Sequence, residues 1–200
     1  MIRHAAFLIA SFLFALPAVA QTFPALHDVV KVASNDVLNI RRSPSAAADI
    51  IGNFAPEDTD IEVITTDPTG KWGMVNIGES SGWASMRFLR RSDNDPDYIL
   101  TQRFQCFGTE PFWSLDVTQG QSALYSTPSS EDRSLSAGLV QTAINRSAPL
   151  FLGLGNGHAA IIRHEACSDG MSDRAFGLSV NFLVPDDGLS LMTGCCSIEP

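Results

Sequence analysis

The side chains of this 200-residue chain that are best suited to chemistry are its cysteines, which all lie in the second half. One segment, His-Glu-Ala-Cys-Ser-Asp, places His164 three residues before Cys167, and a histidine with a cysteine is the pair that thiol catalysis uses. A nucleophile and its base are normally assembled across a fold, and here neither a helix after Cys167 nor a histidine after His164 is present. We therefore predict that the chain is not an enzyme, and a cysteine hydrolase using Cys167 and His164 is the alternative.

Disulfide formation is the expected fate of the cysteines, because an even number in an exported chain is typical of a disulfide framework. The four residues are Cys106, Cys167, Cys195 and Cys196. A bond between the neighbours Cys195 and Cys196 would close a strained ring, which leaves two pairings open. In both, each bond closes a loop of tens of residues and stabilises the fold by roughly 3–5 kcal/mol.

A zinc site is the main alternative use of these thiols. His158 and His164 lie near Cys167 in the sequence. No C-x-x-C or H-x-x-x-H pair supplies the spacing of a tetrahedral site. We predict no metal and no cofactor.

An acidic turn in the second half is a further candidate metal site. Asp169, Asp173 and Glu110 supply the oxygen ligands that calcium prefers, but no D-x-D-x-D-G loop is present. Asp169-Gly170 and Ser172-Asp173 are typical of consecutive turns whose side chains cap backbone amides. Arg174 is expected to neutralise the same carboxylates.

Two tryptophans and an arginine in the first half are candidate ligand-binding residues. Trp72 and Trp83 stand in short β-runs, where they form either part of the core or an aromatic platform for a peptide or sugar face. Arg41 is suited to hold a carboxylate through two parallel hydrogen bonds, or to form a salt bridge within its loop. We predict Arg41, Trp72 and Trp83 as the ligand-binding residues.

Short runs of alternating apolar residues, separated by turn residues, position these side chains. The expected strands cover residues 29–32, 37–40, 61–65, 72–75, 82–85, 112–117, 122–126, 138–144, 150–154, 159–163, 178–184 and 189–193. Strands at this spacing without helices between them predict an all-β protein with two small β-barrels or sandwiches in series.

The N-terminal residues 1–20 have the layout of a secretory signal peptide. Arg3 precedes an apolar run over 5–16, and Ala18-Val19-Ala20 forms a cleavage site before Gln21. The apolar run is shorter than the roughly 20 residues that span a bilayer. We expect a periplasmic or secreted protein that is not membrane-anchored after cleavage.

Charge divides the rest of the chain into two parts. The whole chain carries −9, of which residues 21–91 contribute −2 and residues 92–200 contribute −8. The break falls in a polar, proline-containing run, so we predict domains over 21–91 and 104–200 joined by a linker over 92–103. An acidic protein is repelled by nucleic acid phosphates, which excludes nucleic acid as a partner.

One ordered set of motifs covers nearly all of residues 30–90. In order, these are Leu38-Asn39-Ile40-Arg41, Pro44-Ser45, Ile51-Gly52, Ile61 to Val63, Trp72, Gly82-Trp83 and Phe88-Leu89. The set resembles a bacterial SH3 domain. The resemblance implies an SH3-like small barrel that binds cell-wall peptides, and a targeting role beside a second domain.

The second domain carries three further motifs. They are Gly-Thr-Glu-Pro-Phe-Trp over 108–113, Asp-Gly-Met-Ser-Asp over 169–173 and Gly-Cys-Cys over 194–196. Together they resemble an uncharacterised family of bacterial envelope proteins, and META-type or lipocalin-like β-barrels are loosely similar. This resemblance implies no activity.

The expected function is non-catalytic binding in the cell envelope. The SH3-like module would dock to peptidoglycan or to a peptide of an envelope protein. Besides the cysteine hydrolase, the alternative is an inhibitor of a wall-lytic enzyme, because such enzymes are often basic and the second domain is acidic.

Overall fold

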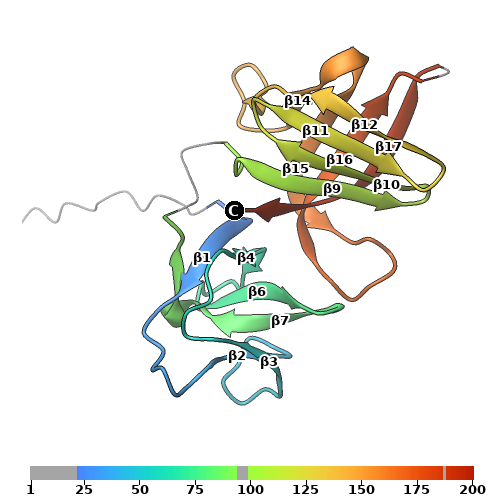
Figure 1. Ribbon diagram of the computed structural model, residues 1–200. Coiled ribbons are helices and arrows are strands. Elements are labelled where there is room, and N and C mark those ends of the chain that lie inside the picture. Colours follow the sequence, from blue (N-terminus) through green and yellow to red (C-terminus); the bar gives the residue numbers. More distant parts are fainter. Residues whose placement is uncertain (1–21, 94–98, 187) are drawn as a thin grey trace, which may run out of the picture.

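The computed structural model describes residues 22–93, 99–186 and 188–200. The described chain is all-β, as predicted, and every pairing between its strands is antiparallel (Figure 1). Its helices within these ranges are two 3₁₀ turns, Met86–Phe88 and Gly155–Gly157. No helix in the described ranges is long and apolar enough to cross a membrane. The predicted signal peptide and the centre of the predicted linker lie outside the described residues.

The first part of the chain forms two small sheets around one apolar core. The three-stranded sheet has the order β4 (Ile61–Val63), β1 (Ala25–Val29), β8 (Leu89–Arg91). The five-stranded sheet has the order β3 (Ile50–Phe54), β2 (Leu38–Arg41), β7 (Ser80–Ser85), β6 (Trp72–Ile77), β5 (Thr65–Thr66). Ile40, Val63, Val75 and Ala84 are fully buried between them.

The second part forms one nine-stranded sheet. Its order is β12 (Ser130–Ser136), β11 (Ser122–Thr127), β10 (Phe112–Thr118), β9 (Arg103–Thr109), β17 (Ser190–Glu199), β16 (Phe176–Val184), β15 (Ala159–Cys167), β14 (Leu150–Gly153), β13 (Gln141–Thr142). The sheet curls far enough for the segment after β12 to reach the end of β14: Ala137 forms a β-bridge with Leu154, and Gly138 N donates to Gly153 O at 3.0 Å. The result is a curled sheet around an apolar interior (Figure 1).

Strict alternation along the central strands fills this interior. On β16 every even-numbered residue from Phe176 to Val184 is buried, and every odd-numbered residue between them is half-buried on the opposite face. Phe182 lies with its ring centre 5.2 Å from those of Trp113 and Tyr125. The apolar side chains therefore lie on one face of the sheet, where they form the core, and the polar side chains lie on the other face.

Two disulfides connect the strands of this sheet. Cys106–Cys196 joins β9 to β17 in the core, and Cys167–Cys195 joins the end of β15 to β17. Cys195 and Cys196 take different partners because successive side chains on a strand point to opposite faces. The predicted disulfide framework is confirmed, and its presence indicates an oxidising, non-cytoplasmic location.

The two parts pack directly against each other. Leu26 on β1 is fully buried within the core of the nine-stranded sheet. The Asn76 side chain donates to Ala175 O at 2.9 Å and accepts from Ala175 N at 3.0 Å. The C-terminal end of β17 also lies beside β1 and β4 (Figure 1). The domains therefore share an interface built from β1, β4, β6 and the segment before β16.

Candidate functional site

A groove of about 480 Å³ in the first domain contains two of the three predicted ligand-binding residues. We call it the Trp72 groove, and its lining includes Lys31, Val32, Asp36, Val37, Arg41, Trp72, Arg87 and Phe88. It is formed by the loop after β1, by β2, by the first residue of β6, by the last residue of β7 and by the 3₁₀ turn before β8. The chain segments that line it are far apart in the sequence and meet only in the fold.

Strand register explains why the predicted residues share one side of the five-stranded sheet. Arg41 pairs with Trp83, and Trp72 pairs with Ser85, two residues further along β7. Directly paired residues and residues two apart on one strand point to the same face. Arg41, Trp72 and Trp83 therefore point away from the core, while Ala84 points into it. All three are half-buried, but Trp83 does not line the groove.

Arg41 binds its loop through a backbone carbonyl and not through the salt bridge that was the alternative expectation. Its Nη1 donates to Ala48 O at 2.7 Å, so the guanidinium fixes the following loop through a carbonyl and not through a carboxylate. The ion pair of that loop is formed by exposed Arg42 and Asp49, at 4.0 Å. Arg41 is thereby held in place at the wall of the groove.

Asp67 determines the position of Trp72. Its Oδ1 accepts from the backbone N–H groups of Trp72 and Lys71, both at 2.8 Å. Its Oδ2 accepts from the Thr69 hydroxyl at 2.6 Å and the Thr69 N–H at 3.1 Å. These bonds, led by the Thr69 hydroxyl, lower the pKa of Asp67. The ionised carboxylate orders the turn from which Trp72 enters β6.

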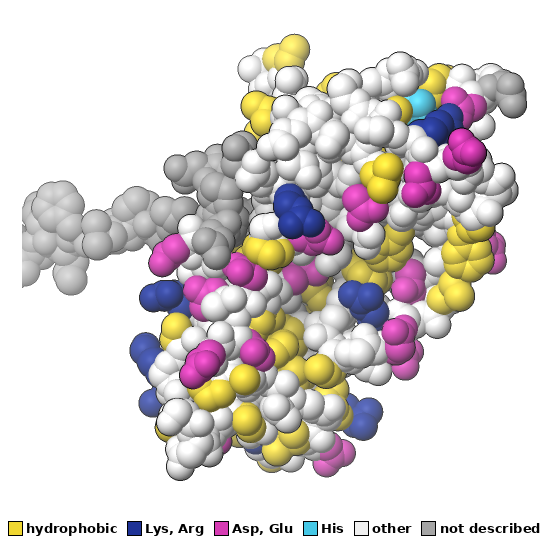
Figure 2. All heavy atoms as spheres, viewed as in Figure 1, with side chains coloured by type: hydrophobic (Ala, Val, Ile, Leu, Met, Phe, Trp, Pro, Cys, Tyr) yellow, Lys and Arg dark blue, Asp and Glu magenta, His cyan; other side chains and the backbone are white. Residues whose placement is uncertain are grey.

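The charge of the Trp72 groove is opposite to that of the chain. Lys31, Arg41 and Arg87 line it against a single acid, Asp36, which gives a net charge of +2 in a chain of −9. The Arg87 guanidinium carbon lies 5.5 Å from the centre of the Phe88 ring. Acidic side chains are spread over the face of the molecule shown in Figure 2. The groove is thus suited to an anionic group attached to an apolar body.

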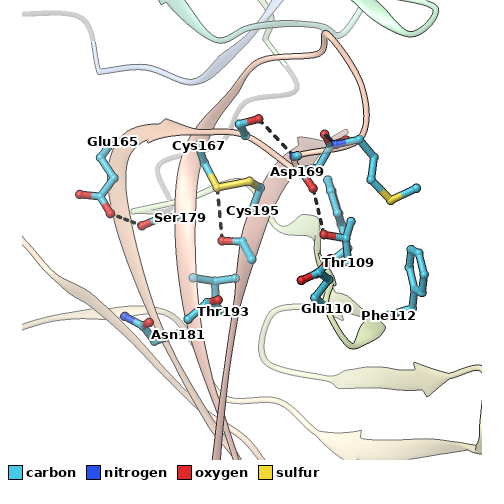
Figure 3. A pocket seen from close by; sticks show the side chains of 17 residues that line it. Thr109, Glu110, Phe112, Glu165, Cys167, Asp169, Ser179, Asn181, Thr193 and Cys195 are labelled. Atoms are coloured by element: carbon cyan, nitrogen blue, oxygen red, sulfur yellow. Dashed lines mark hydrogen bonds between the residues drawn. A yellow bond between two sulfur atoms is a disulfide. The ribbon is translucent and has the colours of Figure 1, made fainter.

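A second and larger groove, of about 830 Å³, lies on the second domain. We call it the disulfide groove, because the Cys167–Cys195 bond lies between its two sides (Figure 3). Residues of β9, β17, β16 and β15 line it, together with the segment 168–171. Two of the motifs singled out in the sequence meet here, since the Thr109 hydroxyl donates to Asp169 O at 2.9 Å.

The Gly-Cys-Cys motif has a steric explanation at this groove. An added Cβ on Gly194 would collide with the Phe107 carbonyl oxygen of β9. Glycine therefore allows β17 to approach β9 closely at the point where pairing begins at Cys195. The close approach places Cys195 and Cys196 for their separate partners.

The segment 169–173 forms the capped turns that the sequence predicted. Asp169 Oδ1 accepts from the N–H groups of Ser172 at 2.9 Å and Met171 at 3.0 Å. These bonds, Ser172 first, lower the pKa of Asp169, with a smaller contribution from the charge of Arg174. Among the described residues, no three His, Cys, Asp or Glu side chains converge as a metal site would require.

Cys167 and His164, the pair considered for thiol catalysis, do not provide a free thiol in this structure. Cys167 is bonded to Cys195, and its Sγ lies 3.4 Å from Gly194 O. His164 lies on β15, where burial lowers its pKa. A thiolate at Cys167 would appear only after reduction of the disulfide. The same bonds occupy the thiols that a zinc site would use.

No protein-family model, curated protein or solved structure matches this chain.

Lys31 and Arg87 are groove residues that the sequence analysis did not single out. Each stands in a connection where no periodic pattern reveals which way a side chain points. Their position next to Trp72 depends on tertiary packing. The scarcity of bases in this acidic chain is the one sequence signal that could have drawn attention to them.

Proposed function

We propose that this protein is an exported, non-catalytic binding protein of the cell envelope. Its first domain, which resembles a bacterial SH3 domain, docks a carboxylate-bearing peptide of peptidoglycan or of an envelope protein. The observation that carries the proposal is the gathering of Lys31, Arg41 and Arg87 around Trp72 in an acidic chain. The disulfides support an exported location.

The chemistry of the Trp72 groove supports this class of ligand. The half-buried indole of Trp72 supplies a large, rigid contact surface for the apolar part of a peptide. Guanidinium groups bind carboxylates through paired, charge-assisted hydrogen bonds, and a lysine adds a point charge. The ligand would thus be held by its body on Trp72 and by its carboxylate on the bases.

Sedimentation with purified peptidoglycan sacculi tests the wall-binding form of the proposal. The protein used is residues 21–200 with both disulfides formed. The variant Lys31→Gln/Arg87→Gln removes two bases from the groove and should lower retention roughly tenfold. The matched control, Arg42→Gln/Arg146→Gln, removes the same charge from exposed positions outside the groove and should be retained as the parent protein is.

Competition identifies the group that is recognised. A peptide with a free carboxylate should displace the protein from sacculi, and its amidated form should not. Equal retention of the groove variant and the control, or displacement by both peptides alike, would contradict the proposal. A parent protein that is not retained at all would contradict binding to the wall and restrict the ligand to protein peptides.

A further inference from the structure

The disulfide groove has the surface properties of an interaction site. Phe112 is 53% exposed and Met171 is 68% exposed, and both line the groove. The groove lies on the polar face of the nine-stranded sheet, where Ser179, Asn181 and Thr193 also reach it (Figure 3). Exposed apolar side chains gathered in a hollow and surrounded by polar ones are typical of a surface that another molecule covers.

The charged side chains of this groove are all acidic. They are Glu110, Glu165 and Asp169, and none of the described residues that line the groove is basic. Residues 92–200 as a whole carry a net charge of the same sign, −8. The ligand that complements this groove is cationic.

The arrangement of the acids favours an extended cation over a point charge. Glu110 lies in the turn between β9 and β10, and Glu165 lies on β15. Strands β17 and β16 separate β9 from β15, and the two carboxylates lie on either side of the disulfide (Figure 3). Glu165 also accepts a hydrogen bond from the Ser179 hydroxyl, and the Asp169 carboxylate accepts from its own turn. The carboxylates are spread along the groove and do not converge on one ion.

We propose that the disulfide groove binds an extended segment of a protein partner that carries lysine or arginine side chains. The charged ends would meet Glu110 and Glu165, while the aliphatic stems pack on Phe112 and Met171. Methionine is well suited to this contact because its flexible side chain adapts to the surface it meets. The site is separate from the Trp72 groove and has the opposite charge, so either proposal stands or fails without the other.

A fluorescent peptide with several lysines spaced by alanine and phenylalanine is the probe, and the same peptide with glutamine for lysine is its neutral counterpart. Fluorescence anisotropy with the disulfide-bonded protein, residues 21–200, should show preference for the lysine peptide and weaker binding as salt rises. Glu110→Gln/Glu165→Gln should weaken binding roughly tenfold. The control Glu131→Gln/Asp132→Asn removes equal charge from exposed positions on β12 and should change affinity less than about twofold.

An aromatic pair of variants tests the apolar contact. Phe112→Ala should weaken binding of the lysine peptide, whereas Phe151→Ala, at a similarly exposed position on β14, should not. Arg42→Gln/Arg146→Gln, at exposed positions outside both grooves, should change this binding less than about twofold. Equal weakening by the two acidic pairs would show attraction to overall charge alone and overturn the proposal. A parent protein that does not prefer the lysine peptide would overturn it as well.

Discussion

A single residue, Glu62 on β4, links the two domains through its carboxyl group. Its Oε2 accepts from the Ser197 hydroxyl at 2.6 Å, and its Oε1 accepts from Ile198 N at 3.1 Å, both on β17. Burial raises the pKa of Glu62 to about 7, although these bonds and the charge of Arg174 act in the opposite direction. Burial at the interface therefore shifts Glu62 toward its protonated form.

The sign of the resulting pH dependence follows from this raised pKa. A carboxyl group that binds its proton more tightly in the folded than in the unfolded state stabilises most below its unfolded pKa of 4.5, and this contribution is lost as pH rises through about 7. We expect the free energy of unfolding to fall by about 1–3 kcal/mol between pH 5 and pH 8 through this residue. Urea unfolding of the parent protein and of Glu62→Gln at both pH values measures it. The difference between the two proteins should shrink or change sign with rising pH, and a difference that is the same at both values would contradict this role.

At the scale of elements, the two disulfides make unequal contributions. Cys106–Cys196 spans 90 residues and lies fully buried in the core, whereas Cys167–Cys195 spans 28 residues and borders a groove. Chain entropy alone gives about 4–5 kcal/mol for the longer loop and about 3–4 kcal/mol for the shorter one. Urea unfolding of Cys106→Ala/Cys196→Ala should thus show the larger loss, to which lost core packing adds. A larger loss in Cys167→Ala/Cys195→Ala would contradict this order.

Alternation of apolar residues predicts some of the strands and misses others: β9 (Arg103–Thr109) alternates in burial along its whole length, yet no strand was expected there. On β16 every second residue is buried, and the pattern predicted a strand there. β1 lies between the two domains and is buried on both faces, so it was expected later in the chain, at 29–32, than its observed position at Ala25–Val29. β12 is mostly exposed and polar at the edge of its sheet, and no strand was expected there. In the Trp72 groove, Arg41 and Trp72 could be predicted from their residue types within short β-runs. Lys31 and Arg87 lie in connecting segments and reach the groove only through the fold.

At the scale of the whole molecule, two grooves of opposite charge lie on two domains that share an interface. The Trp72 groove gathers bases in a chain of −9, and the disulfide groove is lined by acids alone among its charged described residues. Because the Asn76 side chain and Leu26 tie the first domain to the second, ligands at both grooves would be held in a fixed relation. If both grooves bind as proposed, the protein connects an anionic envelope ligand to a cationic partner.

Nuclear magnetic resonance of the isotope-labelled protein, residues 21–200 with both disulfides formed, tests whether the Trp72 groove binds carboxylate-bearing peptides. Soluble cell-wall peptide fragments with free carboxylates are titrated into it, and amide and indole N–H shifts are followed. We predict that the largest shifts occur at Trp72, including its indole N–H, and at Lys31, Arg41 and Arg87. Shifts that are largest in the second domain, or a spectrum that does not change at all, would contradict it.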